Sequence, residues 1–136
     1  MITMTKNKRA NSFNTGIAAE YFVLSQLYRM GVEVYISQGN RKAIDIRVVQ
    51  NDKSISIDVK AVRGYTSFIV NNVSASKDHF IVFVSYKNKF EEVQTIPEVF
   101  IVPSSEVVKF AKPYGKRKII MTRDIAKYKD KWNIIE

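Results

Sequence analysis

The strongest constraint on the fold comes from two alternating segments, residues 43–49 and 54–62, which are separated by the polar turn 50–53. In each segment nearly every second side chain is a branched aliphatic one, which is the period of a β-strand with one buried face. Because so short a turn reverses the chain, the two segments predict an antiparallel hairpin. A hairpin with one apolar face needs another element to cover that face.

The rest of the chain supplies such elements. Good helix formers fill the stretch between Asn14 or Thr15, which are N-cap residues, and Gly31, a typical helix end. Two continuous apolar runs predict strands buried on both faces. We therefore expect a mixed α/β fold, in which helices pack on a mixed sheet. The further expected elements are strands at 32–36, 66–71, 80–86, 99–102 and 118–121, helices at 103–111 and 122–132, and polar loops or turns at 37–42, 87–97 and 112–116.

The length and residue usage narrow the class of protein. A chain of 136 residues suggests one domain, expected at 12–136 after a loose basic arm at 1–11. The absence of cysteine excludes a disulfide scaffold, a cysteine zinc site and a thiol nucleophile. The single histidine, His79, precedes a predicted core strand, and we interpret it as structural. No run is apolar enough to span a membrane and no secretory signal opens the chain, so we expect a soluble, cytoplasmic protein with no membrane partner.

The charge balance points to a polyanionic partner. The chain has 22 lysines and arginines against 13 acidic residues, a formal net charge of +9. Nucleic acid is the commonest partner of so basic a small protein. The alternative is that the chain is merely soluble and basic.

Two acidic residues interrupt the polar faces of the predicted hairpin. With the turn at 50–53, paired residues have numbers that sum to 103 or 104, so Asp45 lies opposite or diagonal to Asp58. Two carboxylates so placed repel each other, and Asp is a poor strand residue. Lys60 follows Asp58 by two positions and shares its face.

A third carboxylate belongs to the predicted helix. Glu20 lies three residues after Ile17 and four before Leu24, on the apolar stripe. A carboxylate on a buried helix face needs a partner. If the helix packs beside the hairpin, Glu20 approaches the two aspartates. Three hard oxygen ligands suit Mg²⁺ or Mn²⁺ rather than zinc.

These positions carry a family resemblance. The pattern Gly16-x-x-x-Glu20, then Ile44-Asp45, then Ile57-Asp58-Val59-Lys60 resembles the PD-(D/E)XK nuclease superfamily, with the archaeal Holliday-junction resolvases as the closest variety. The match covers about residues 12–62. It implies a restriction-endonuclease-like fold, a mixed β-sheet core of αβββαβ type flanked by helices. One departure is that Ile44 stands where the superfamily's eponymous proline would be.

The resemblance also implies roles for individual residues. It places the carboxylates of Glu20, Asp45 and Asp58 on the metal, with the backbone carbonyl of Val59, and Lys60 at the nucleophilic water. Resolvases carry a serine in the loop before the second strand's acid, and Ser37 lies in the matching loop. The alternative is a structural ion pair on a solvated sheet face, between Asp58 and Lys60 or between Asp45 and Arg47.

The function implied is that of a Mg²⁺-dependent endonuclease that hydrolyses DNA, with branched or structured DNA as one substrate class. A homodimer is expected, because resolvase-like relatives are dimeric and two cuts need two sites. Two alternatives stay open: a DNA-binding module of the same fold that does not cleave, and an RNA-processing nuclease.

Several residues around the acids are expected to contact phosphates, and for each the alternative is a solvated surface position. They are Lys8, Arg9, Ser37, Arg41, Lys42, Arg47 and Arg63. A denser basic cluster lies far along the chain at Lys112, Lys116, Arg117 and Lys118, and is either a second contact patch or a turn.

Overall fold

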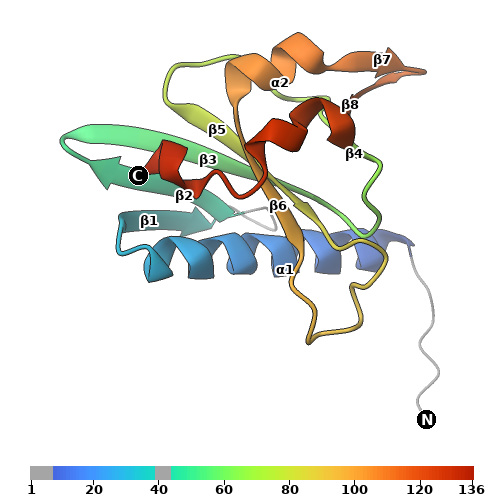
Figure 1. Ribbon diagram of the computed structural model, residues 1–136, viewed down its shortest axis with the longest axis horizontal. Coiled ribbons are helices and arrows are strands. Elements are labelled where there is room, and N and C mark those ends of the chain that lie inside the picture. The colour runs from blue at the N-terminus through green and yellow to red at the C-terminus, as the bar shows by residue number, and fades with distance from the viewer. Residues whose placement is uncertain (1–7, 39–43) are drawn as a thin grey trace.

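The computed structural model describes residues 8–38 and 44–136, and Figure 1 shows their arrangement. The first half contains α1 (Lys8–Arg29), β1 (Glu33–Gln38), β2 (Ile44–Gln50), β3 (Lys53–Val62), β4 (Ser67–Ile69) and β5 (His79–Ser85). The second half contains β6 (Glu98–Pro103), α2 (Ser104–Phe110), β7 (Lys112–Tyr114), β8 (Arg117–Met121) and the 3₁₀ helices η1 (Thr122–Tyr128) and η2 (Trp132–Ile135).

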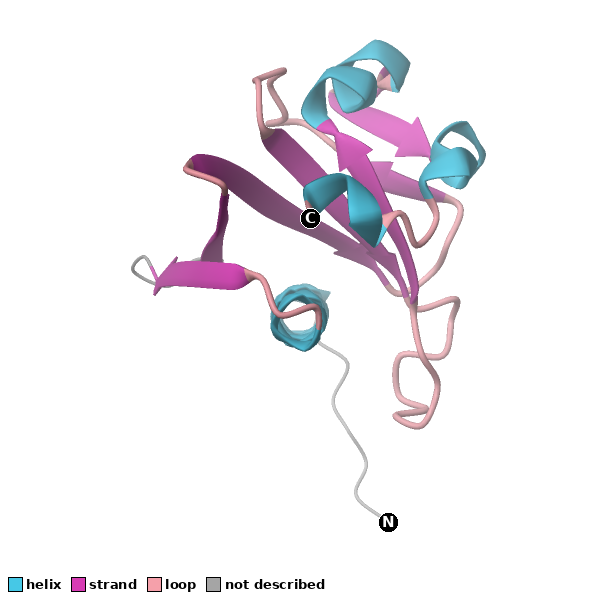
Figure 2. Ribbon diagram, turned by 60° about the vertical axis from the view of Figure 1, so that its left-hand side comes forward, coloured by secondary structure: helices cyan, strands magenta, loops and turns pink. Residues whose placement is uncertain are grey.

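Two sheets organise the chain. The large sheet has the strand order β1-β2-β3-β5-β6, in which β3 and β5 run parallel and the other neighbours run antiparallel. A smaller antiparallel sheet has the order β4-β8-β7. Figure 2 shows the twist of the large sheet, with α1 seen end-on beneath it. The mixed α/β fold expected from the sequence is confirmed.

The hairpin of β2 and β3 forms in the register that the sequence predicts. Ile46 pairs with Ile57 and Gln50 pairs with Lys53, so paired numbers sum to 103. The two residues between them, Asn51 and Asp52, have φ angles of 51° and 62°. Two successive positive φ values are those of a type I′ turn, whose twist matches that of a hairpin and which Asn and Asp tolerate.

Helix α1 covers the apolar face of this hairpin. Ala19, Val23 and Leu27 recur at four-residue spacing and are fully buried against Ile46 and Ile57. The helix stops where the sequence predicts, because Gly31 adopts a φ of +76°, the left-handed conformation that ends helices. The C-terminus closes the same core, since Gln50 Nε2 donates to the Ile135 carbonyl over 3.2 Å.

The opposite face of the large sheet is covered only in part. A second core joins β5 and β6 to β4, β8, α2 and η1, and contains Phe68, Phe83, Phe100 and Ile120. In Figure 1 these elements lie above the sheet and α1 lies below it. The same face of β2 and β3 stays accessible, because Asp45 is exposed there. This uncovered part of the sheet positions the candidate site.

The N-terminal helix begins earlier than predicted. It starts at Lys8, within the segment expected to be a loose arm, and residues 1–7 lie outside the described part of the chain. Asn14 and Thr15, the two expected cap residues, both lie inside the helix, where the Thr15 hydroxyl donates to the Asn11 carbonyl over 2.7 Å. That bond back along the helix satisfies the hydroxyl without a cap.

The strand expected at 66–71 is present as β4, which belongs to the small sheet. Two predictions for the second half of the chain are wrong in detail. Residues 112–116, expected to be a turn, begin with β7, which pairs with β8. The helix expected at 122–132 is two separate 3₁₀ helices. Trp132, in the second of them, packs against the core between α1 and the large sheet.

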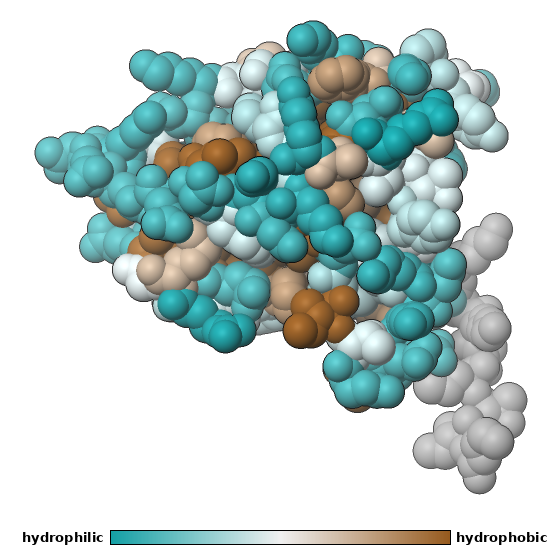
Figure 3. All heavy atoms as spheres, in the orientation of Figure 1, coloured by the Kyte–Doolittle hydropathy of each residue, from teal (hydrophilic) through white to brown (hydrophobic). Residues whose placement is uncertain are grey.

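The accessible surface shows no large apolar area on the face seen in Figure 3, where hydrophobic atoms form small patches among hydrophilic ones. In the described residues, no helix is both long enough and apolar enough to cross a membrane.

The packing of α1 predicts a sharp contrast between neighbouring positions. Leu27→Ala removes a fully buried side chain and should lower the free energy of unfolding by about 2–5 kcal/mol. Tyr28→Ala alters a side chain that is 58% exposed and should change it by less than about 0.5 kcal/mol. Urea denaturation followed by circular dichroism measures both, and equal effects would contradict the packing of α1 described above.

Candidate active site

Two carboxylates from neighbouring strands face one open pocket. Asp45 lies near the start of β2 and Asp58 in the middle of β3. The paired part of the hairpin ends at Ile46 and Ile57, and Asp45 and Asp58 are the next residue on each strand. Both line a pocket of about 370 Å³ on the uncovered part of the sheet. Neighbouring carboxylates repel each other, so the pair is an arrangement that packing alone does not explain.

Lys60 offsets part of this repulsion. Its Nζ lies 3.6 Å from Asp58 Oδ2, and both side chains remain partly exposed. An ion pair so open to water contributes little to stability, at most about 1 kcal/mol. The other ion pair considered from the sequence does not form, since Arg47 has no ion pair with Asp45 in the described structure.

Glu20 does not join the two aspartates, contrary to the prediction. It lies on α1, is only 4% exposed, and takes part in an interaction of its own, as a buried carboxylate must. Helix α1 packs on the face that carries Ile57, whereas Asp58 follows Ile57 and therefore points to the opposite face. Across residues 8–38 and 44–136, no three acidic or histidine side chains come together in a way that could hold a metal ion.

The edge strand β1 adds polar side chains beside the carboxylates. Ser37, expected in a loop, is the last but one residue of β1 and pairs with Asp45, so it shares the face of that carboxylate. Tyr35 pairs with Arg47 in the same way. The negative charge of Glu33 raises the pKa of the Tyr35 hydroxyl above its ordinary value.

The expected phosphate contacts have different outcomes. Arg47 is exposed on the carboxylate face and lines the pocket. Arg41 and Lys42 lie outside the described residues, as do the side chains of Lys8 and Arg9 at the start of α1. The side chain of Val59 packs against the core between α1 and the large sheet. Its backbone carbonyl is the group that was expected to bind the metal.

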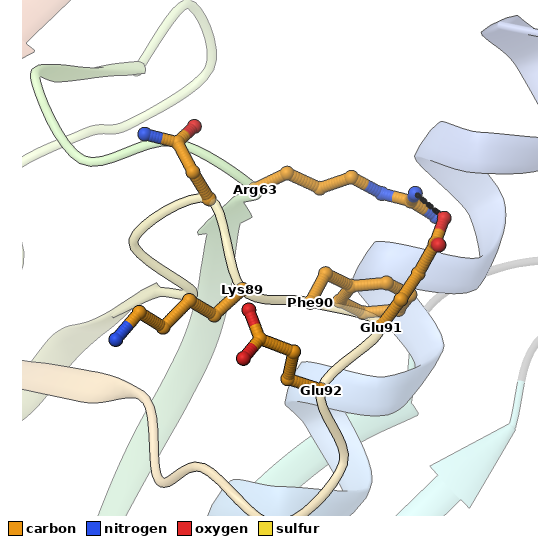
Figure 4. A pocket seen from close by; sticks show the side chains of 6 residues that line it. Arg63, Lys89, Phe90, Glu91 and Glu92 are labelled. Atoms are coloured by element: carbon orange, nitrogen blue, oxygen red, sulfur yellow. Dashed lines mark ion pairs between the residues drawn. The ribbon is translucent and has the colours of Figure 1, made fainter.

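Arg63, another of the expected phosphate contacts, is held by several contacts within the chain. Its Nε donates to Thr15 Oγ1 over 2.8 Å and its Nη2 to the Asn11 carbonyl over 3.4 Å. The guanidinium also stacks 4.0 Å from the centroid of the Phe90 ring and lies 3.8 Å from Glu91 Oε1. Figure 4 shows the side chain reaching toward α1 beside that ring. Arg63 therefore ties β3 to α1 and to the loop between β5 and β6.

The sequence interpretation missed two members of the pocket, His79 and Ser56. His79, taken as a structural residue, lines it together with Ser56, and the Ser56 Oγ is 2.6 Å from His79 Nδ1. The two residues are paired across the parallel strands β3 and β5. Hairpin rules did not reveal this neighbour, because parallel strands are joined by a long connection rather than a turn.

One of three comparisons with known proteins found a match to this architecture. No protein-family model and no curated protein matches the chain. Among solved structures, it is similar to a bacterial homing endonuclease, I-Ssp6803I, with a TM-score of 0.60 and 16% sequence identity. The alignment covers 89% of this chain and 88% of the other. The chain therefore has a restriction-endonuclease-like fold: a five-stranded mixed sheet with flanking helices.

The environment of Arg63 predicts an effect on stability. Arg63→Ala removes its hydrogen bonds to α1 and its stacking on Phe90, and should lower the free energy of unfolding by about 1–2 kcal/mol. Arg47→Ala is the control, because Arg47 is exposed and should change that energy by less than about 0.5 kcal/mol. The structural role of Arg63 is wrong if urea denaturation gives both variants the stability of the wild type.

Proposed function

We propose that this protein is a metal-dependent endonuclease that hydrolyses phosphodiester bonds of DNA with Mg²⁺ or Mn²⁺. The observation that carries the proposal is that two carboxylates from neighbouring strands, Asp45 and Asp58, line one open pocket, with Lys60 beside Asp58. The likeness of the fold to that of a homing endonuclease supports it, although a fold by itself does not define an activity.

The donor set fits a magnesium ion even though Glu20 lies elsewhere. Mg²⁺ commonly keeps several waters and is held by one or two carboxylates together with substrate phosphates, rather than by a complete protein cage. Asp45 and Asp58 supply two such carboxylates, and the backbone carbonyl of Val59 is a further oxygen donor between Asp58 and Lys60. A divalent cation between the aspartates would also remove their mutual repulsion.

Each residue then has a defined task. Asp45 and Asp58 hold the metal, which when bound lowers the pKa of a water ligand and polarises the phosphoryl oxygen. Lys60 is placed to orient the attacking water, or to stabilise the negative charge that builds on the phosphate. Arg47, exposed on the same face, adds a positive charge for the DNA backbone.

A second candidate function is a DNA-binding module of the same fold that does not cleave. The specific observation in its favour is that Glu20 is separated from the aspartates by the sheet, which leaves the described residues without a three-carboxylate group. Calorimetric titration with Mn²⁺ separates the two functions. A folded protein that binds DNA but takes up no Mn²⁺ favours the module.

The nuclease proposal predicts the effect of two substitutions. Asp58→Asn and Lys60→Ala should each lower Mg²⁺-dependent cleavage of DNA at least about 100-fold, because each removes a group that acts in the transition state. Asp52→Asn is the matched control, since Asp52 is an exposed residue of the hairpin turn and should retain full activity.

The assay is a cleavage panel of duplex DNA, branched DNA, single-stranded DNA and RNA. Preferential cutting of RNA would redirect the proposal to an RNA-processing nuclease. If the wild type cuts none of these with Mg²⁺ or Mn²⁺, or if Asp58→Asn cuts as fast as Asp52→Asn, the proposed function is wrong.

We also propose that the protein acts as a homodimer, so that two sites serve the two strands of a duplex. Size-exclusion chromatography with light scattering should give the mass of two 15.7 kDa chains. The mass of a single chain would contradict the dimer without affecting the catalytic site.

A further inference from the structure

A row of three polar side chains crosses the large sheet directly beside the carboxylates. Arg47 pairs with Ser56 across β2 and β3, and Ser56 pairs with His79 across β3 and β5. Residues paired in this way present their side chains on the same face, so the row lies on the face of Asp45 and Asp58. All five residues line the same pocket.

The row offers hydrogen-bond donors that the described protein does not use. Arg47 forms no hydrogen bond and no ion pair with any described residue. His79 has its Nδ1 2.6 Å from the Ser56 hydroxyl, which leaves Nε2 as the ring nitrogen for a ligand. Which group donates depends on the tautomer of the ring. When the Ser56 hydroxyl donates to Nδ1, the neutral imidazole carries its proton on Nε2, which is then a donor for a ligand.

We propose that Arg47, Ser56 and His79 form a phosphate-binding subsite, which holds the nucleic-acid phosphate next to the one at Asp45 and Asp58. Guanidinium, hydroxyl and imidazole groups are donors that proteins use for phosphate oxygens. In this subsite Arg47 and His79 bind the phosphate, and Ser56 is a positioning residue that sets the orientation of the imidazole. The assignment to nucleic acid rests on the proposed function.

The spacing of the rows supports this assignment. Arg47 follows Asp45 by two positions and Ser56 precedes Asp58 by two, so the row lies about 6.6 Å along the strands from the carboxylates, at about 3.3 Å per residue. That distance is comparable with the separation of neighbouring phosphates along a nucleic-acid strand. A nucleic-acid strand that runs along β3 would then place one phosphate at the carboxylates and the next phosphate at the row from Arg47 to His79.

The order of charges along the same direction agrees with this path. On the polar face of β3, Asp58 lies between Ser56 and Lys60. Ser56 in turn has Arg47 and His79 as its neighbours on the adjacent strands. Positive groups therefore flank the carboxylates on both sides along the strand. Without them the aspartates would repel the phosphates of an incoming strand, and this flanking charge offsets that repulsion.

The competing explanation is that the bond between Ser56 and His79 only fastens the start of β5 to β3. The backbone already does this, because the Ser56 amide donates to the Asp78 carbonyl over 2.9 Å. A fastening role predicts a loss of stability on substitution, whereas a phosphate subsite predicts a loss of nucleic-acid affinity in a stable protein.

The first test measures binding of a short DNA duplex by fluorescence anisotropy in EDTA, where no metal supports cleavage. Arg47→Ala should weaken binding several-fold and reduce the slope of log affinity against log salt concentration by about 1, which is the loss of one phosphate contact. Arg29→Ala is the matched control: Arg29 is exposed at the end of α1, bonds only Gln26 among the described residues, and should leave the slope unchanged.

The second test uses the fact that the chain has one histidine, so the imidazole signals of His79 are identified without further assignment. In an NMR titration of the full chain with the same duplex, the chemical shifts of these signals should change as the duplex binds. They should reach saturation at the same duplex concentration as the anisotropy. Ser56→Ala should weaken binding, and Ser56→Thr, which keeps the hydroxyl, should restore it. Urea denaturation of both Ser56 variants separates this effect from a loss of stability.

The outcomes distinguish the subsite from the nuclease. Three outcomes would each overturn the subsite. They are unshifted His79 signals at saturating duplex, a salt slope reduced as much by Arg29→Ala as by Arg47→Ala, and no binding of DNA in EDTA. Such a result leaves the cleavage proposal to its own assay with Mg²⁺. Conversely, a shifted His79 and a reduced slope in a protein that cuts nothing would support the subsite and remove the nuclease.

Discussion

The alternation of side chains along the hairpin of β2 and β3 is the constraint on which the structure depends. A strand turns successive side chains to opposite faces, so one sequence serves two environments at once. Ile46 and Ile57 pack under α1 and build the first core, while Asp45 and Asp58 reach the uncovered face. A shift of register by one residue would bury the carboxylates and expose the core residues, so the apolar face fixes the position of the site.

The repulsion between Asp45 and Asp58 is unfavourable, and contacts within the protein offset only part of it. Of the two neighbouring carboxylates, Asp58 has Lys60 at 3.6 Å, and that ion pair is too open to water to balance their repulsion. Proteins generally keep such local conflicts where function requires them. The conflict lies beside an open pocket and not in a core, which is where a ligand of opposite charge can resolve it.

The likeness in fold concerns the architecture of the chain, whereas the site residues concern its chemistry. The likeness to a homing endonuclease at 16% identity shows the architecture: a large mixed sheet with α1 on one side and a smaller sheet with α2 on the other. The carboxylate pair, Lys60 and the row from Arg47 to His79 are properties of this chain. The proposed chemistry depends on those residues, because one fold hosts many activities.

Much of the site was predictable from neighbouring residues in the sequence. The period of two and the short turn predicted the hairpin, its register and the shared face of Asp45, Asp58 and Lys60, because those relations involve residues a few positions apart. The helical period likewise predicted that Glu20 is buried. Periodicity states that a side chain is turned inward, but it does not state which face of a sheet the helix will cover.

The tertiary structure decided the relations between distant segments. It placed α1 on the Ile57 face and so kept Glu20 away from the aspartates, and it committed Arg63 to α1. It also paired β3 with β5 in parallel, which brought His79 beside Ser56 and into the pocket. Local order follows from the geometry of consecutive residues. Which strands pair, and which face a helix covers, depends on how the whole chain buries its apolar surface, and no local pattern records that choice.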